Sequence, residues 1–272
     1  MLKITIGQYY PAQSPVHRMD ARMKLLCIII FITILFFVGN FAGYAFAALF
    51  LFSVIKVSKV PPRYLFRGLR AILFIIVFTA FLNIFFTPTG NVVFSVGFVT
   101  VTDLGLLNAA RMALRLVMLI VGSAMLMLTT TPIEMTAAIE FGLKPLKKIG
   151  VPAHEIAMMM TIAMRFIPTL LEEMDKIMKA QMARGADFDT GGIIKKAKSM
   201  VPLLVPLFIS SFRRAEELAL AMEARCYRGD VGRTRMKKMK MRLLDYGALL
   251  IMGGFVAVLM VIEHLSGVYG FV

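Results

Sequence analysis

The sequence predicts an all-α integral membrane protein with about five transmembrane helices and a cytoplasmic region of one short and two long amphipathic helices. Three observations predict this class. Hydrophobic residues make up 59% of the 272 residues and charged residues only 17%, whereas a soluble domain is roughly half apolar and about one quarter charged. Many apolar residues gather in long uncharged runs, and such runs cross a bilayer as helices. Further apolar residues, between residues 132 and 242, recur with helical periodicity among charged ones.

Five apolar runs approach the length of about 20 residues that a helix needs to cross a bilayer. The predicted spans are Met23–Val38, Phe41–Ile55, Ala71–Phe86, Leu104–Leu128 and Leu243–Ile262. The first two are near the lower limit of that length, and a tight Gly39-Asn40 turn separates them.

Two arginines, Arg111 and Arg115, stand inside the fourth run. Intramembrane arginines are candidates for a functional site. The alternatives are that they face the protein interior or that they extend along the helix toward the outer surface. The sequence leaves these readings open.

The net charge of +15 is concentrated in a few segments. Lys and Arg gather in residues 1–24, 56–70 and 132–242, and the positive-inside rule places these segments in the cytoplasm. The N-terminus is then cytoplasmic and the C-terminus outside. This topology divides the chain into a membrane region of four spans (1–131), a cytoplasmic region (132–242) and a last span (243–272).

The cytoplasmic region contains three predicted helices. A short amphipathic helix is expected at Ile133–Ile149, preceded by threonine hydroxyls that can cap it. Long amphipathic helices are expected at Ala153–Arg184 and Ser199–Arg225, joined by a loop at Ala186–Lys198.

Each long helix carries an apolar stripe, and an exposed apolar surface of this size marks an interaction site. In the second helix, the small residues Ala215 and Ala219 would let another helix approach closely. Pro202 and Pro206 fall near its predicted start, where a proline costs least.

One short motif occurs at the predicted ends of both long helices. Ala180-Gln-Met-Ala-Arg184 closes the first, and Ala221-Met-Glu-Ala-Arg225 closes the second, 41 residues later. The favourable interaction of a cation with a helix C-terminus explains a single copy. Two matched copies indicate docking to two similar partner subunits.

Motifs for catalysis, nucleotide binding and metal binding are absent from the sequence. It contains no P-loop, H-E-x-x-H or C-x-x-C motif, and its three histidines are isolated from one another. We therefore expect neither an enzyme nor a metal or other cofactor. The basic residues lie beside the spans, where anionic lipid attracts them, so the expected contact is the lipid bilayer and not nucleic acid.

Several stretches between residues 129 and 230 carry a family resemblance. They are Thr129–Glu134, Lys144–Pro152, Met164–Leu171, Ala180–Gly185, Ser211–Arg225 and Tyr227–Gly229. In combination they resemble the transmembrane coupling subunit (T component) of energy-coupling-factor transporters. The resemblance implies an ABC-type importer of a vitamin or similar micronutrient in a bacterial cell membrane. Two cytosolic ABC-type ATPases would dock on the two long helices and hydrolyse ATP, and a small substrate-binding membrane subunit (S component) would rest on the same helices.

The resemblance also implies roles for named residues. The ATPase-docking residues would be Ala183, Arg184, Gly185, Ala224, Arg225 and Cys226. The family commonly has Gly where Cys226 stands, which weakens the expectation of a capped second helix. The interface with the S component would comprise Met159, Ala163, Ile167, Leu170, Met174, Phe208, Phe212, Ala215, Ala219 and Met222.

The main alternative function is a stand-alone channel or secondary transporter. Such a protein would place polar or ionisable residues in several spans. Here only Asn83, Arg111 and Arg115 come close to that pattern.

Overall fold

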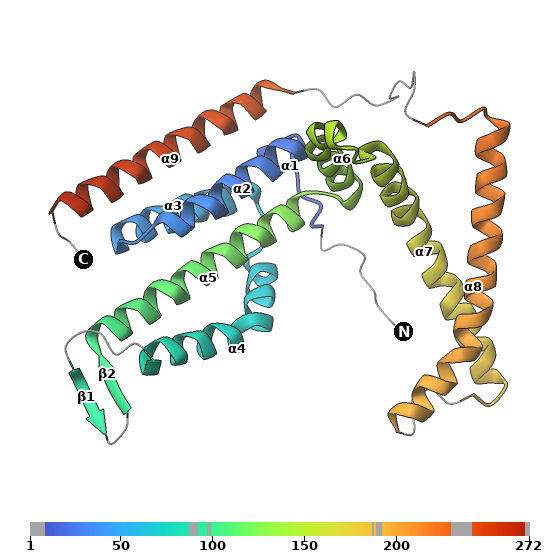
Figure 1. Cartoon of the computed structure of the whole chain (residues 1–272), viewed down its shortest axis with the longest axis horizontal. Helices are drawn as coiled ribbons and strands as arrows, with labels where there is room; N and C mark the ends of the chain where they lie inside the picture. The colour runs from blue at the N-terminus through green and yellow to red at the C-terminus, as the bar shows by residue number, and fades with distance from the viewer. Residues whose placement is uncertain are drawn as a thin grey trace. The chain divides into compact units, whose positions relative to one another are not determined.

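The computed structural model describes residues 9–86, 92–96, 99–186, 188, 192–229 and 241–269. Apart from one short hairpin and the connecting segments, these residues are helical (Figure 1), which confirms the all-α membrane class. By its internal contacts the chain divides into two compact units. One comprises Met1–Ala138 and Lys238–Val272, and the other comprises Ile139–Lys237.

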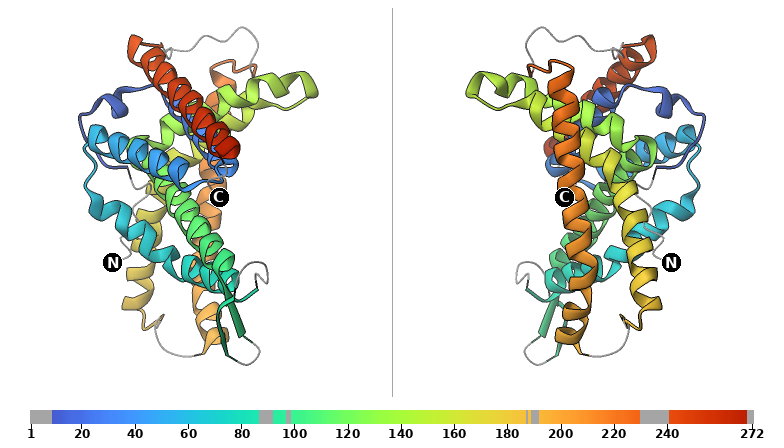
Figure 2. Two further views of the ribbon diagram at one scale, coloured as in Figure 1. Left: turned by 90° about the vertical axis from the view of Figure 1, so that its left-hand side faces the viewer. Right: turned by 90° about the vertical axis from the view of Figure 1, so that its right-hand side faces the viewer.

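The first unit contains the predicted spans. Its helices are α1 (Pro15–Arg18), α2 (Ala21–Phe37), α3 (Phe41–Ser58), α4 (Pro62–Phe86), α5 (Asp103–Thr129) and α9 (Leu243–Tyr269). The hairpin lies between α4 and α5 and pairs β1 (Val92–Val96) with β2 (Val99–Thr102) in antiparallel fashion. Helix α9 packs along α2 and α3, while α5 contacts α2, α3 and α4 (Figure 2).

Among the described residues, three helices are long and apolar enough to cross a membrane. They are Phe41–Ser58, Asp103–Thr129 and Leu243–Leu265, and the bent pair Pro62–Arg70 with Ile72–Phe85 would make a fourth. The first predicted span, α2, has 17 residues. It is about 25 Å long, somewhat less than the roughly 30 Å of a bilayer's hydrocarbon core.

Helix α4 begins earlier than expected. The predicted span starts at Ala71, but the helix starts at Pro62, inside the basic segment. Proline suits the first turn of a helix because its missing N–H has no intrahelical partner there. The basic segment is therefore partly helical.

The core of the first unit is apolar and closely packed. Leu35, Ala47, Leu128 and Leu259 are almost fully buried, and they come from α2, α3, α5 and α9. The ring of Phe255 in α9 stacks on Phe50 of α3 with centroids 4.2 Å apart. These contacts join α9, the last helix of the chain, to α2 and α3.

Arg115 faces the protein interior, which decides between the alternatives for that residue. Its Nε donates to the Tyr44 hydroxyl at 3.0 Å, and its Nη2 donates to the Val38 carbonyl at 2.9 Å. Val38 is the C-cap of α2, and a cation is favourable at a helix C-terminus. One turn away, the Arg111 guanidinium lies 5.4 Å from the centroid of the Phe41 ring. Arg115 thus closes the turn between α2 and α3.

We expect Arg115→Met to lower the free energy of unfolding by about 2 kcal/mol, since hydrogen bonds from charged donors are worth roughly that much. The measurement is thermal unfolding of the purified chain in detergent. Arg111→Met is the matched control and should cost less, because an arginine over an aromatic ring contributes only about 0.5–1 kcal/mol at exposed sites. Equal losses for the two variants would contradict the capping role of Arg115.

A polar junction joins three helix ends in the same unit. Asp245 in the first turn of α9 is 1% exposed. Its carboxylate accepts from the Asp20 amide at 2.9 Å and from the Arg242 amide at 2.7 Å. Lys24 of α2 is also buried, and its Nζ donates to the Thr129 carbonyl at the end of α5, at 2.8 Å.

Asp20 is the N-cap of α2 and forms an ion pair with Arg22 at 2.8 Å. Burial alone would raise the pKa of Asp20, but the hydrogen bonds from Arg22 lower this pKa below its usual value. Asp20 is therefore ionised at neutral pH and can cap the helix.

The opposite ends of α2 and α9 also meet. The Gly39 amide, in the turn between α2 and α3, donates to Glu263 of α9 at 2.9 Å. The starts of α2 and α9 therefore lie at one end of the unit, and the turn with Gly39 lies at the other, as an alternating topology requires. Which end is cytoplasmic stays a prediction.

The second unit begins within α6 (Pro132–Leu143) and continues through a 3₁₀ helix (Lys144–Ile149), α7 (Ala153–Ala183) and α8 (Ile193–Ala224). Before α6, Thr131 forms the expected cap: its hydroxyl accepts from the Glu134 amide, and Glu134 accepts from the Thr131 amide, both at 3.3 Å. The α-helix stops at Leu143 because Pro145 cannot donate a backbone hydrogen bond.

The predicted start of the second long helix at Ser199 is wrong. Helix α8 begins at Ile193, so part of the predicted loop is helical and Pro202 and Pro206 lie inside the helix. Each proline leaves a carbonyl four residues earlier without its helical donor. Both prolines are exposed, as is Lys198, so water can reach this stretch of backbone.

Candidate functional site

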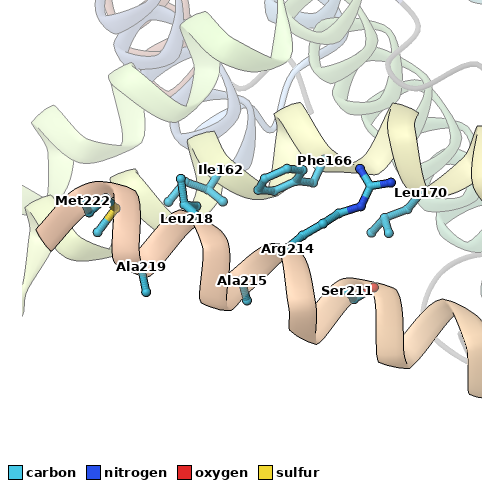
Figure 3. Close-up of a pocket in the computed structure, with 9 residues that line it drawn as sticks. All are labelled: Ile162, Phe166, Leu170, Ser211, Arg214, Ala215, Leu218, Ala219 and Met222. Atoms are coloured by element: carbon cyan, nitrogen blue, oxygen red, sulfur yellow. The ribbon is translucent and has the colours of Figure 1, made fainter. Parts of the chain in front are cut away.

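Helices α7 and α8 pack against each other as a crossed, antiparallel pair. Figure 3 shows the groove between them, in which Ile162, Phe166 and Leu170 of α7 face residues of α8. Residue numbers rise along α7 from Ile162 to Leu170, while along α8 they fall from Met222 to Ser211. The C-terminal ends of the two helices therefore point in opposite directions from the crossing.

The two helices end in the same backbone motif. In α7 the Ala186 amide donates to the Gln181 carbonyl at 3.0 Å, and the Gly185 amide donates to the Met182 carbonyl at 3.0 Å. This pair of bonds is a Schellman motif, which satisfies carbonyls that a helix end would otherwise leave unpaired. Arg184 is its C-cap residue, with φ −88° and ψ 8°.

The second helix repeats this arrangement. The Tyr227 amide donates to the Met222 carbonyl at 3.0 Å, and the Cys226 amide donates to the Glu223 carbonyl at 2.8 Å. Arg225 is the C-cap residue, with φ −92° and ψ 12°. Cys226 adopts the left-handed conformation of Gly185, with φ 56° against 86°. The second helix is therefore capped, although cysteine stands where the family commonly has glycine.

Both C-cap arginines are exposed, as are the alanines that precede them. Arginine presents a planar fork of donors that suits carboxylates and helix ends of a partner. Two equivalent cationic ends on one pair of helices form a candidate docking site for two similar subunits.

Because a left-handed non-glycine residue is strained, we expect Cys226→Gly to stabilise the end of α8 by about 1 kcal/mol. Thermal unfolding in detergent measures the gain. Gly185→Ala is the matched control at the equivalent position and should lose stability by a similar amount. Apart from the adjoining residues of the chain, no atom lies within 4 Å of the methyl group that this change would add, so its effect is conformational. A destabilised Cys226→Gly variant would contradict the strain at this cap.

The residues predicted for the S-component interface fall into two groups. Leu170, Ala215, Ala219 and Met222 line the groove between α7 and α8. Ala215 and Ala219 are exposed, and in Figure 3 their methyl groups point away from α7. Ile167 and Met174 are half-buried, and the remaining residues, Met159, Ala163, Phe208 and Phe212, are exposed.

An exposed apolar stripe runs along α8. Phe208 and Phe212 are 65% and 62% exposed, and their rings pack with centroids 4.6 Å apart. We call the following exposed residues the α8 stripe: Val201, Leu204, Val205, Phe208, Ile209 and Phe212. The predicted interface contained only Phe208 and Phe212 of this stripe, although helical periodicity from Val201 onward could have indicated Leu204.

Sequence reasoning also missed the polar contact at the crossing. The Nη2 of Arg214 in α8 donates to Oε2 of Glu173 in α7 at 2.7 Å, and both side chains are partly exposed. Within the described part of the chain, no group of His, Cys, Asp and Glu side chains is placed to hold a metal ion.

Comparison with known proteins gives consistent matches over most of the chain. The model of the family CbiQ, described as cobalt transport protein, matches residues 12–239. The chain is 58% identical over 244 residues to the energy-coupling factor transporter transmembrane protein EcfT of Clostridium kluyveri, covering 89% of this chain and 90% of that protein. The proteins of the same name from Thermosediminibacter oceani and Bacillus subtilis are 54% identical over 253 residues and 50% identical over 239 residues. These matches cover 93% and 88% of this chain, and 95% and 90% of the respective relatives.

Proposed function

The chain belongs to the CbiQ family and is a multi-pass transmembrane component of an energy-coupling factor transporter, and we propose that it couples ATP hydrolysis by two partner subunits to uptake of a substrate. Two cytosolic ABC-type ATPases dock at the ends of α7 and α8. Their movement passes through these helices to a small substrate-binding membrane subunit. The substrate is a vitamin or a similar micronutrient, and the transporter lies in a bacterial cell membrane.

The observation that carries this proposal is the pair of matched helix ends. Arg184 and Arg225 are exposed C-cap residues with the same backbone geometry, and each follows an alanine. Two copies of one ATPase, or two similar ATPases, require two similar contact points. Charge-assisted hydrogen bonds from each arginine to a partner carboxylate would hold the contact and give it a defined geometry.

The α8 stripe supports the proposed contact with the substrate-binding membrane subunit. Its six apolar side chains are more than half exposed in this chain, and exposed apolar surface of this extent marks an interaction site. A membrane subunit with a complementary apolar surface would cover it. The groove-lining residues of the predicted interface lie between α7 and α8.

The chain supplies no ATP hydrolysis in this proposal. Its sequence has no P-loop, so energy comes from the partners. The positive-inside rule, applied to the basic segments, favours the cytoplasmic side for α7 and α8, where ATPases would have access to them.

A stand-alone channel or secondary transporter is the weaker alternative. Such a protein uses intramembrane charge along a substrate pathway. Here the carbonyl of Val38 and the hydroxyl of Tyr44 occupy two donors of Arg115, so a capping contact accounts for this charge.

Co-purification and reconstitution test the proposal. The affinity-tagged chain is expressed with the ATPases and the small membrane protein from its own genome, purified in detergent and placed in liposomes. We expect a complex with two ATPase subunits and one substrate-binding subunit. Substrate uptake should occur only when the ATPase subunits are supplied with ATP. An ATPase whose P-loop lysine is replaced is the control and should assemble without uptake. Substrate flux through liposomes that hold this chain alone would contradict the proposal.

A further inference from the structure

The Glu173–Arg214 ion pair joins two positions that are equivalent in the chain's internal repeat. The two residues are 41 apart in sequence. The same spacing separates Arg184 from Arg225 and relates the two Ala-x-x-Ala-Arg motifs. Residues of α7 therefore correspond to residues of α8 that lie 41 positions later, and in this correspondence Glu173 is the counterpart of Arg214.

A residue touches its own counterpart only near a two-fold axis. A second pair agrees with such an axis, since Leu170 and Ser211 are also 41 apart and line the same groove from facing helices. The antiparallel course of α7 and α8 is the one that a two-fold rotation produces. The two helices thus form a pseudo-symmetric pair whose local axis passes close to Glu173 and Arg214.

The two C-cap arginines are placed symmetrically about this axis. Arg184 lies eleven residues after Glu173, and Arg225 lies eleven residues after Arg214. At the rise of an α-helix each is about 16 Å along its own helix from the crossing. A shift of one helix along its own axis past the other would lengthen one arm relative to the other.

Apolar packing alone defines this crossing point poorly. The groove beside the ion pair is lined by alanines at 215 and 219 and by flexible side chains such as Met222, which a neighbouring helix can slide across at low cost. A charge-assisted hydrogen bond is directional and short. Buried or partly buried polar pairs are best attested as devices that select one register.

We propose that the Glu173–Arg214 ion pair fixes the crossing point of α7 and α8 and thereby holds Arg184 and Arg225 at equal distances from it. Glu173 and Arg214 are positioning residues, since they act through the two arginines. Opposite charges at equivalent positions are essential to this role, because identical charges facing each other at the axis would repel. The consequence for ATPase docking rests on the proposed function, but the geometric role does not.

A charge-swap experiment tests this role. Spin labels are attached at Ala180→Cys and Ala221→Cys, an equivalent and exposed pair, in a chain that also carries Cys27→Ala and Cys226→Gly. The distance between the labels is measured by pulsed electron paramagnetic resonance on the isolated chain in lipid nanodiscs. We expect Glu173→Arg or Arg214→Glu alone to shift or broaden the distance distribution, and the double swap to restore it.

The reconstituted transporter gives the second readout. Each single reversal should lower substrate uptake per ATP hydrolysed by about tenfold, as for coupling energies between contacting residues, while the ATPases remain bound. The double swap should return substrate uptake per ATP to within about twofold of that of the unchanged transporter. If a charge reversal impairs folding, Glu173→Gln replaces it, because this change removes the charge without adding repulsion. Its substrate uptake per ATP should lie between that of a single reversal and that of the double swap.

The Asp175–Lys179 ion pair provides the matched control. It joins two residues of α7 alone at 2.6 Å, so Asp175→Lys should change neither the label distance nor the uptake per ATP. Unchanged distances in both single reversals, or a swap that fails to restore them, would overturn the proposal. If the reversals shift the label distances but the unchanged chain binds no ATPases, the positioning role is supported and the proposed function is refuted.

Discussion

Reversing both C-cap arginines, in the double variant Arg184→Glu and Arg225→Glu, should abolish assembly with the ATPases and leave insertion in the membrane intact. Both side chains are exposed, so the change removes no buried contact of this chain. Each docking contact would lose a charge-assisted hydrogen bond worth about 1.5–3 kcal/mol and gain repulsion between like charges. Over two sites the affinity should fall by at least roughly a hundredfold.

Co-purification from detergent measures this effect, with the amount of chain in the membrane fraction as the reference. Arg165→Glu is the matched control, because Arg165 is an exposed arginine of α7 that lies far from its C-terminal end. It should retain both ATPases. Each single reversal should weaken assembly less than the double variant does, since one docking end remains. Full assembly and uptake in the double variant would refute docking at these arginines.

Features that depend on local sequence were predictable. The end of α7 was expected at Arg184 and is observed at Ala183, with Arg184 as the C-cap. A glycine that adopts a left-handed conformation stops a helix through the backbone of a few neighbouring residues. The start of α8 was not predictable by the same rule, because exposed prolines at 202 and 206 mimic a helix boundary without breaking the helix.

Contacts between distant residues could not be predicted. Arg115 binds the carbonyl of Val38, 77 residues away, and the sequence left open whether this arginine faces inward or outward. Helical periodicity indicates which residues share a face but not which helix covers that face. For this reason the sequence could not show that Ala215 and Ala219 line a groove between α7 and α8, and their contact with a partner subunit stays a prediction.

The internal repeat lies between these two cases. The spacing of 41 residues was visible in the two arginine motifs, and it predicted equivalent helix ends, which the matching Schellman motifs now describe in atomic terms. The same spacing relates Glu173 to Arg214, but only the antiparallel crossing shows that these counterparts touch. A sequence repeat alone therefore does not show that two helices are related by symmetry. The arrangement of the helices in the fold is needed to show the axis.

Asp245→Ala should cause a large loss of stability in the membrane unit. The Asp245 carboxylate is almost fully buried and accepts from two backbone amides, those of Asp20 and Arg242. Alanine would leave both amides without this acceptor. Each buried unsatisfied donor costs roughly 1–3 kcal/mol, so we expect a loss of about 3 kcal/mol, seen as a lower unfolding temperature in detergent.

Two further variants separate this role from a general effect of charge. Asp245→Asn keeps one carbonyl oxygen and can serve one of the two amides, so it should lose about half as much stability. Asp103→Ala removes an exposed acid from the first turn of α5, where only the interaction with the helix dipole, at most about 1 kcal/mol, is lost. If Asp245→Ala cost no more than Asp103→Ala, Asp245 would act as an ordinary first-turn acid. A cost close to the expected value would instead mean that one carboxylate stabilises the starts of both α2 and α9. Removing it would then take a hydrogen-bond acceptor from the N-terminal ends of both helices at once.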